Sequence, residues 1–215
     1  MLNAVIDISH HNTIRSFTDV QQAGIMGIIH KATQGTGYFD PTFNTNRAAI
    51  EAAGLLFGAY HFGVGGDPVA QADFFLSKAG NNTLLVLDFE PNTQGPDMSM
   101  AEAEQFVHRI REVTGRYPGL YSGHTIKEAV AAAGITSPDQ TELSNCWLWI
   151  AQYTTAAQPV IPRIWPSWTL WQYTDGAAGS PPYDVNGIGR CDRDQFYGTA
   201  DDLNAFWATN SGAPA

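Results

Sequence analysis

Short apolar runs alternate with stretches of helical period along most of the chain. Most of these runs have the length and flanking turn residues of buried strands. They are AVIDI (4–8), MGIIHKA (26–32), LLFGAYHF (55–62), TLLVLDFE (83–90), GLYS (119–122), CWLWIAQY (146–153) and TLWQYT (169–174). Helical candidates, several of which end in glycine, lie between the earlier runs at residues 17–24, 41–54, 69–80 and 99–115.

Strands separated by helices of this length favour parallel βαβ units. The C-terminal part is poor in helical pattern and rich in aromatic residues, which suggests a barrel closed by simpler strands. The predicted fold class is therefore α/β. We expect an irregular single-domain (β/α) barrel of about eight strands, the first five with helical crossovers and the last three helix-poor. Residues 1–210 are expected to form this domain, and residues 211–215 a flexible tail.

Polar side chains recur where the apolar runs end. Asp7 follows AVI, Tyr60 and His61 follow LLFGA, and Asp88 and Glu90 follow LLVL. One charged residue at the end of a strand is common and usually carries no function. In parallel barrels, however, catalytic residues lie at the C-terminal ends of the strands. Several acids converging on one barrel mouth would form a carboxylate-rich cleft suited to glycosyl transfer.

The segment LLVLDFEPN carries the strongest chemical signal. Asp88 and Glu90 are two residues apart on a predicted strand, so both side chains face one side, with Cα atoms about 6–7 Å apart. Like charges at this spacing, together with apolar surroundings, raise the pKa of a carboxyl group and allow Glu to act as a general acid. The alternative is that both are solvated residues at a strand end, before a loop that begins at Pro91.

Asp7 is a candidate third carboxylate, with local capping of the following loop as its alternative. Several histidines (His10, His11, His30 and His61) stand near these acids in the predicted barrel, so a metal site is a further alternative. No HExxH or comparable ligand spacing is present, so we expect no metal and no cofactor.

Two C-terminal runs combine tryptophan and amide side chains. WLWIAQY contains Trp149 and Gln152, and WTLWQYTDG contains Trp171 and Gln172. Indole rings stack on the C–H faces of sugars, and amides hydrogen-bond hydroxyl and acetamido groups, so these runs suit sugar recognition. A hydrophobic core with amides at its edge is the alternative interpretation.

Composition and charge exclude other classes of function. The chain is 44% hydrophobic and 15% charged, as expected of a folded globular protein. Its formal net charge is −10, with only 11 Lys and Arg residues, which argues against binding to nucleic acid or to anionic membranes. The N-terminus has no secretory signal pattern, so we expect synthesis in the cytoplasm. Cys146 and Cys191 are expected to be two buried thiols or one disulfide.

These residues together resemble glycoside hydrolase family 25, the lysozymes of phage lysins, bacteria and some fungi. The likeness runs nearly from end to end, and its motifs are specific in their order and spacing, although each is weak alone. They are IDISHHN (6–12), KATQGTGYFDPTFNTNRAAIEAAGLLFGAYHFG (31–63), LDFE (87–90), GLYSG (119–123), WIAQY (149–153), WQYT (171–174) and CDRDQFYG (191–198).

The resemblance implies hydrolysis of the β-1,4 bond between N-acetylmuramic acid and N-acetylglucosamine in peptidoglycan strands. By motif position, Glu90 corresponds to the general acid. Asp88 corresponds to the companion carboxylate that orients the 2-acetamido group of the substrate or stabilises oxocarbenium-like charge. Asp7 and Asp192 match two further acids of the cleft. The residues expected to bind substrate are Tyr60, His61, Tyr121, Trp149, Gln152, Trp171 and Gln172.

We expect a retaining mechanism in which the N-acetyl oxygen of the substrate attacks the anomeric carbon. Asn12, Gln34 and Asp194 depart from residues frequent in the family, which concerns substrate preference rather than the reaction class. The alternatives are a wall-glycan-binding barrel without turnover and a chitinase-like hydrolase. We expect a monomer that reaches the cell wall after phage-type lysis or through another export route.

Overall fold

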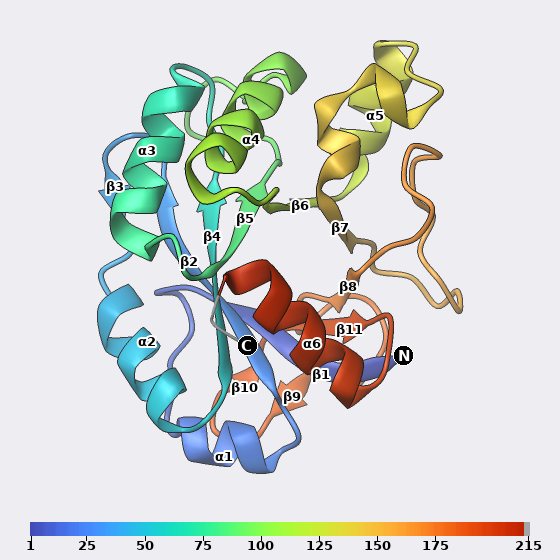
Figure 1. The fold of residues 1–215 in the computed structure, drawn as a ribbon. Coiled ribbons are helices and arrows are strands. Elements are labelled where there is room, and N and C mark those ends of the chain that lie inside the picture. Colours follow the sequence, from blue (N-terminus) through green and yellow to red (C-terminus); the bar gives the residue numbers. More distant parts are fainter. Residues whose placement is uncertain (213–215) are drawn as a thin grey trace.

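In the computed structural model, which describes residues 1–212, eight strands close into a barrel (Figure 1). Seven of them are parallel to their neighbours in the order β1-β2-β4-β5-β6-β7-β8, and β11 closes the barrel antiparallel to both β8 and β1. The barrel strands are β1 (Leu2–Ile8), β2 (Gly27–Gln34), β4 (Leu56–Phe62), β5 (Leu84–Asp88), β6 (Gly119–Ser122), β7 (Trp147–Ala151), β8 (Leu170–Thr174) and β11 (Asp192–Phe196). Three short strands lie outside it: β3 (Tyr38–Phe39), β9 (Asp184–Val185) and β10 (Gly189–Arg190).

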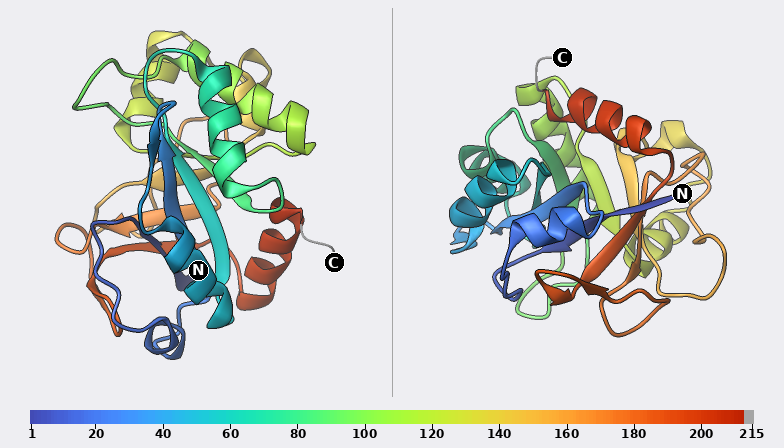
Figure 2. Two further views of the ribbon diagram at one scale, coloured as in Figure 1. Left: turned by 90° about the vertical axis from the view of Figure 1, so that its left-hand side faces the viewer. Right: turned by 90° about the horizontal axis from the view of Figure 1, so that it is seen from below.

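The helices α1 to α5 connect the first six barrel strands and lie around the outside of the barrel (Figures 1 and 2). They are α1 (Phe17–Gln22), α2 (Phe43–Ala52), α3 (Pro68–Ala79), α4 (Met100–Thr114) and α5 (His124–Ala132), and α6 (Ala200–Ser211) follows the last strand. Two 3-10 turns, Pro138–Gln140 and Glu142–Asn145, precede β7. The predicted α/β barrel, with helical crossovers after its first five strands, is confirmed.

The sequence-based prediction lacked the barrel strand β11 and the helices α5 and α6, as well as the short strands and 3-10 turns outside the barrel. Strand β11 has the polar sequence DRDQF, in which Asp192, Asp194 and Phe196 alternate with outward residues, so the inward face carries acids instead of an apolar pattern. The end of the chain also differs from the expectation. Helix α6 continues to Ser211, with Gly212 as its left-handed cap, so two residues of the expected tail end the helix. Residues 213–215 lie outside the described residues.

Two apolar clusters hold the fold together. The larger one fills the layer between the strands and the surrounding helices. The smaller one fills the barrel interior, where Val5, Ile29 and Leu84 meet Leu203 and Trp207 of α6. The indole N–H of Trp207 donates to the backbone oxygen of Phe57 at 2.9 Å. Helix α6 therefore covers the N-terminal end of the barrel, and the polar side chains lie at the opposite end.

The start of β6 shows how tightly this covered end is packed. A Cβ atom at Gly119 would overlap the indole ring of Trp147, which itself packs edge-on against Phe206 of α6 with ring centroids 5.1 Å apart. We therefore expect Gly119→Ala to lower the free energy of unfolding by about 1–3 kcal/mol, the usual cost of overpacking. Urea unfolding measures this change. Gly37→Ala is the control, because no atom lies within 4 Å of the added methyl group. Equal stability of the two variants would contradict the prediction.

Two further observations bear on the expectations from the sequence. Cys146 and Cys191 are both buried and free, so the disulfide alternative is not realised. Within residues 1–212, no helix is both long and apolar enough to cross a membrane.

Candidate active site

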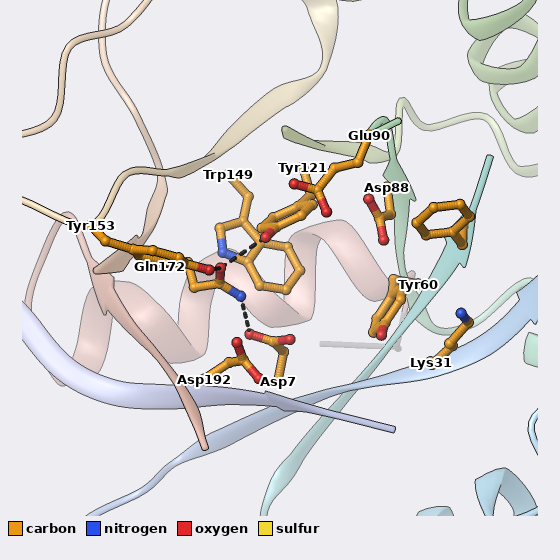
Figure 3. A pocket seen from close by; sticks show the side chains of 11 residues that line it. Asp7, Lys31, Tyr60, Asp88, Glu90, Tyr121, Trp149, Tyr153, Gln172 and Asp192 are labelled. Carbon is orange, nitrogen blue, oxygen red and sulfur yellow. Dashed lines mark hydrogen bonds between the residues drawn. The ribbon is translucent and has the colours of Figure 1, made fainter. Parts of the chain in front are cut away.

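A cleft of about 300 Å³ opens at the C-terminal ends of the barrel strands (Figure 3). Most of the residues predicted from the sequence line this cleft, contributed by nearly every strand of the barrel. The lining residues are Asp7, Lys31, Tyr60, Phe62, Asp88, Glu90, Tyr121, Trp149, Tyr153, Gln172 and Asp192. The four predicted carboxylates thus share one cavity, although they are separated by up to 185 positions in the chain (Asp7 to Asp192).

Asp88 and Glu90 form one wall of the cleft. Asp88 ends β5, Phe89 turns outward into the larger apolar cluster, and Glu90 faces the cleft again. Burial and then the charge of Glu90 raise the pKa of Asp88 well above its ordinary value, and Asp88 Oδ1 has no hydrogen-bond partner among the described residues. Burial also raises the pKa of Glu90. The site therefore favours retention of a proton on this pair of carboxyl groups.

An ordered hydrogen-bond chain crosses the opposite wall. The side-chain oxygen of Gln172 accepts bonds from the hydroxyls of Tyr121 (2.8 Å) and Tyr153 (2.7 Å). This arrangement turns the amide nitrogen of Gln172 toward Asp7, whose Oδ2 accepts at 2.7 Å, as Figure 3 shows. Asp192 lies beside Asp7, and burial, with a smaller contribution from Asp175, raises the pKa of Asp192 to about 6.

A fifth carboxylate lies beneath the cleft. Asp194 is fully buried, and its Oδ1 accepts a 2.6 Å bond from the indole N–H of Trp149. Its Oδ2 has no partner in the described part of the chain, and burial raises its pKa well above the ordinary value. The bond to Asp194 fixes the indole ring of Trp149, which also contacts Tyr121 edge-on with centroids 4.6 Å apart.

Strand alternation corrects three of the expected substrate-binding residues. Tyr60 faces the cleft, so His61 faces outward, where it is enclosed by Phe75 and Phe106 and bonds Thr33 and Gln71. Burial lowers the pKa of His61 to about 4, so it is a neutral core residue.

By the same alternation Gln172 faces inward and Trp171 outward. Trp171 packs against Trp168 in the larger apolar cluster and donates to the backbone oxygen of Gln152 at 2.8 Å. Gln152 lines a neighbouring cavity instead of the main cleft.

Three lining residues were not among the predicted catalytic or substrate-binding residues: Lys31, Phe62 and Tyr153. Each lies two positions from a residue whose inward direction is clear, namely Ile29, Tyr60 and Ala151. Once the structure shows the inward direction of these residues, the period-2 pattern identifies the three lining residues. Lys31 is the one cationic side chain that lines this cleft. Its Nζ donates to Gln34 Oε1 at 2.8 Å and lies 4.9 Å from the centre of the Phe62 ring.

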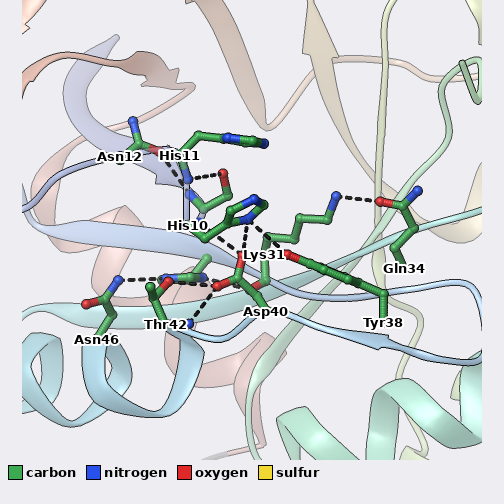
Figure 4. A network of polar contacts seen from close by, with 11 residues as sticks. His10, His11, Asn12, Lys31, Gln34, Tyr38, Asp40, Thr42 and Asn46 are labelled. Atoms are coloured by element: carbon green, nitrogen blue, oxygen red, sulfur yellow. Dashed lines mark hydrogen bonds and ion pairs between the residues drawn. The ribbon is translucent and has the colours of Figure 1, made fainter. Parts of the chain in front are cut away.

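A polar network supports the cleft beside Lys31 (Figure 4). Asp40 accepts from the backbone N–H of His10 (3.0 Å), from the hydroxyl of Thr42 (2.7 Å) and pairs with His10 Nδ1 (2.9 Å). Burial alone would raise the pKa of Asp40, but these hydrogen bonds together lower it. The hydrogen bonds between His10 and Asp40 hold the loop after β1 in place. No group of three His, Cys, Asp or Glu residues within 1–212 is arranged to hold a metal ion.

The model of the glycosyl hydrolases family 25 matches residues 6–180. The chain belongs to this family. It is 32% identical over 206 residues to lysozyme M1 of Streptomyces globisporus, covering 91% of this chain and 68% of that protein. It is 31% identical over 200 residues to the N,O-diacetylmuramidase of Chalaropsis sp, covering 84% of this chain and 92% of that protein.

Solved structures show the same architecture. The bacterial lysozyme of Streptomyces coelicolor superposes with a TM-score of 0.80 at 28% identity, covering 97% of this chain and 98% of that one. The family 25 lysozyme of Aspergillus fumigatus gives a TM-score of 0.77 at 29% identity, over 96% and 98% of the two chains. This family 25 protein is therefore a glycoside hydrolase, with a carboxylate-lined cleft at the mouth of its barrel.

Proposed function

We propose that this family 25 hydrolase is an N-acetylmuramidase that cleaves the β-1,4 bond between N-acetylmuramic acid and N-acetylglucosamine in bacterial peptidoglycan. The observation that carries the proposal is the pairing of partly buried Glu90, whose pKa is raised, with buried Asp88 in one cleft. A glycosidase needs a carboxylic acid that keeps its proton near neutral pH. The activities named for the related lysozyme M1 and N,O-diacetylmuramidase support this choice of substrate.

In the proposed reaction, the carbonyl oxygen of the substrate's 2-acetamido group attacks the anomeric carbon. The bond from that carbon to the bridging oxygen breaks, and Glu90 gives its proton to the departing oxygen. Asp88 lines the cleft next to Glu90, so its carboxylate is placed to hold the acetamido N–H while the carbonyl oxygen attacks. Water then attacks the anomeric carbon of the cyclic intermediate, the bond from that carbon to the acetamido oxygen breaks to restore the acetamido group, and the Glu90 carboxylate accepts the proton of that water. Two inversions at one carbon retain its configuration.

The other cleft residues have distinct proposed roles. Asp7 and Asp192 bring negative charge close to the position where oxocarbenium-like charge develops. The bonds among Gln172, Tyr121 and Tyr153 hold the amide that bonds Asp7, so this wall is formed before substrate binds. The rings of Tyr60, Tyr121 and Trp149 offer apolar faces for the sugar.

Digestion of purified peptidoglycan, followed by borohydride reduction and mass spectrometry of the fragments, tests the proposed bond. Reduced muramic acid at the new ends is the expected result. Reduced glucosamine would mean that the other glycosidic bond is cut. Cleavage of chitin oligomers at a comparable rate would favour the chitinase-like alternative. Anomeric analysis of the first product by NMR distinguishes retention from inversion.

The acidity of Glu90 also predicts a pH profile. Glu90 is largely buried, and the charged or titratable groups near it are the imidazole of His124 and the carboxylates of Asp192 and Asp88. Because Glu90 acts as the proton donor, kcat/KM should fall as the pH rises through the pKa of Glu90, which lies above its ordinary range. Asp192 raises this pKa and the charge of His124 lowers it. Asp192→Asn should therefore shift the alkaline limb to lower pH, and His124→Gln to higher pH. If both variants shifted the alkaline limb in the same direction, the limb would not report the pKa of Glu90.

A further inference from the structure

Lys31 is the one cationic side chain among the residues that line the main cleft, which also carries four carboxylates. Under the proposed function, the muramic acid that keeps the anomeric carbon occupies this cleft. Its lactyl group is itself a carboxylate wherever no stem peptide is attached, and every ionised acid of the cleft would repel that group. The position of the single cation therefore bears on how an acidic sugar can bind there.

The ammonium group of Lys31 is held in one place. Its Nζ donates to Gln34 Oε1 at 2.8 Å and lies 4.9 Å from the centre of the Phe62 ring and 5.6 Å from that of Tyr38. Figure 4 shows the lysine side chain extended toward Gln34. Aromatic faces attract a cation, so the two rings and the amide fix the charge at this end of the cleft.

No acid pairs directly with Lys31 within residues 1–212. None of the salt bridges there includes it, and its hydrogen-bond acceptor, Gln34, is neutral. An ammonium group has three N–H donors, and the bond to Gln34 uses one of them. The positive charge and two donors are therefore available to a group of the substrate.

The position of Lys31 matches the order of substituents around the sugar ring. The proposed reaction places the anomeric carbon, C1, at Glu90 and the acetamido group on C2 at Asp88. The next carbon, C3, carries the lactyl ether of muramic acid. In the barrel, the strand of Asp88 (β5) neighbours β4, and β4 neighbours the strand of Lys31 (β2). Figure 3 shows Asp88 between Glu90 and Lys31, so the lactyl group is expected on the Lys31 side of Asp88.

Phe62 adds an apolar surface at the same place. Its half-buried ring lines the cleft beside the ammonium group, and Phe62 is the register partner of Asp88 on the neighbouring strand. A lactyl group carries a methyl group next to its carboxylate, so it matches an apolar ring next to a cation. The glucosamine unit of chitin has only a hydroxyl group on C3 and would gain neither contact.

We infer that Lys31, together with Phe62, binds the lactyl group on C3 of muramic acid and makes a free lactyl carboxylate the preferred form of that group. This inference rests on the proposed function, in which muramic acid occupies the main cleft. A stem peptide converts the lactyl carboxylate into a neutral amide, which can accept a hydrogen bond from Lys31 but offers it no charge. The enzyme should therefore favour glycan strands from which the stem peptides have been removed.

The test uses peptide-free glycan strands, prepared with an amidase, before and after their lactyl carboxylates are coupled to methylamine. The sugars and the scissile bond are the same in both preparations, so the ratio of the two kcat/KM values isolates the lactyl charge. The wild type should favour the acidic strands by about fivefold, because a hydrogen bond between two charged groups is the stronger one. Lys31→Met removes the charge and keeps most of the apolar stem, and it should bring the ratio close to one.

Gln34→Glu tests the same charge without altering Lys31. A carboxylate within hydrogen-bond distance of Nζ would form an ion pair with it, so this variant should also lose the preference for acidic strands. It decides the question alone if Lys31→Met does not fold. Lys78→Met is the matched control, since it removes an exposed lysine of α3 that does not line the cleft, and it should keep the wild-type ratio.

An unchanged ratio in folded Lys31→Met would overturn the inference. If kcat/KM then fell equally on both preparations, the charge of Lys31 would act on the neighbouring Asp88 instead of the substrate. A wild type that cleaves both preparations equally, with muramic acid at the new reducing ends, would refute the inference and leave the proposed function standing. Failure of the wild type to cleave these strands and intact peptidoglycan would refute the proposed function, and the inference with it.

Discussion

Glu90→Gln is expected to lower the rate of peptidoglycan cleavage by about 10²–10⁴-fold, the usual contribution of a general acid. The amide matches the carboxyl group in shape but cannot transfer a proton to the departing oxygen. Because the proton transfer stabilises only the transition state, kcat should fall while the affinity for glycan changes little. Release of reducing ends measures the rate, and calorimetric titration with glycan fragments measures the affinity.

The control for this variant is Glu128→Gln, which makes the same change at an exposed position of helix α5. It should be fully active. Substantial activity in Glu90→Gln would place the proton donor elsewhere. If wild type and Glu90→Gln both bind glycan and neither cleaves it, the protein is a binding barrel without turnover.

Asp88→Asn is expected to change activity and stability in opposite directions. Loss of the carboxylate next to the acetamido group should lower kcat/KM by about 10²-fold, comparable with the cost of misaligning a reacting group. The stability change follows from the raised pKa of Asp88, which burial and then Glu90 cause. Below the pKa of an unfolded Asp, the protonated carboxyl of Asp88 makes its full contribution to the stability of the folded protein. That contribution is lost as the pH rises through the pKa of Asp88 in the folded state.

Asn cannot ionise, so Asp88→Asn should melt at a higher temperature than the wild type at neutral pH and at the same temperature near pH 3. Asp194→Asn is the matched comparison, because Asp194 is also buried with a raised pKa but does not line the cleft. It should gain stability with the same pH dependence and lose less activity. A lower melting temperature for Asp88→Asn at neutral pH would indicate that Asp88 is ionised and stabilised by Lys31.

The trade-off expected at Asp88 reflects how the cleft is built. Five carboxylates, counting Asp194, lie at one end of the barrel within reach of each other's charge, and the cations near them are few. Burial and then repulsion from neighbouring carboxylates raise the pKa values of Asp7 and Asp88, and burial with a smaller contribution from Asp175 raises that of Asp192. Such an arrangement destabilises the folded state at neutral pH, and it is the environment that raises the pKa of Glu90.

The sequence by itself determined the order of the first seven barrel strands and of α1 to α4, and the acids at the strand ends. Alternation of apolar runs with helical stretches depends on local periodicity, which requires no tertiary contacts to be recognised. The pair Asp88 and Glu90 was also recognisable locally, because the two residues share a face through their spacing alone. Strand β11 was not, because its inward positions include Asp192 and Asp194, which complete the cleft instead of a core.

Only the tertiary structure decided which member of each neighbouring pair faces the cleft: Tyr60 or His61, Gln172 or Trp171, Tyr153 or Gln152. A shift of one residue reverses the face of a strand, and β1, β2 and β11 each contain an irregularity in register. The cavity that Gln152 lines beside Glu90 was also not predictable from the sequence. Helix α5 had no predicted pattern, and its Lys127 contacts Gln152 only in the folded chain. Inward direction and charge pairing arise between strands distant in the chain, so local sequence carries no record of them.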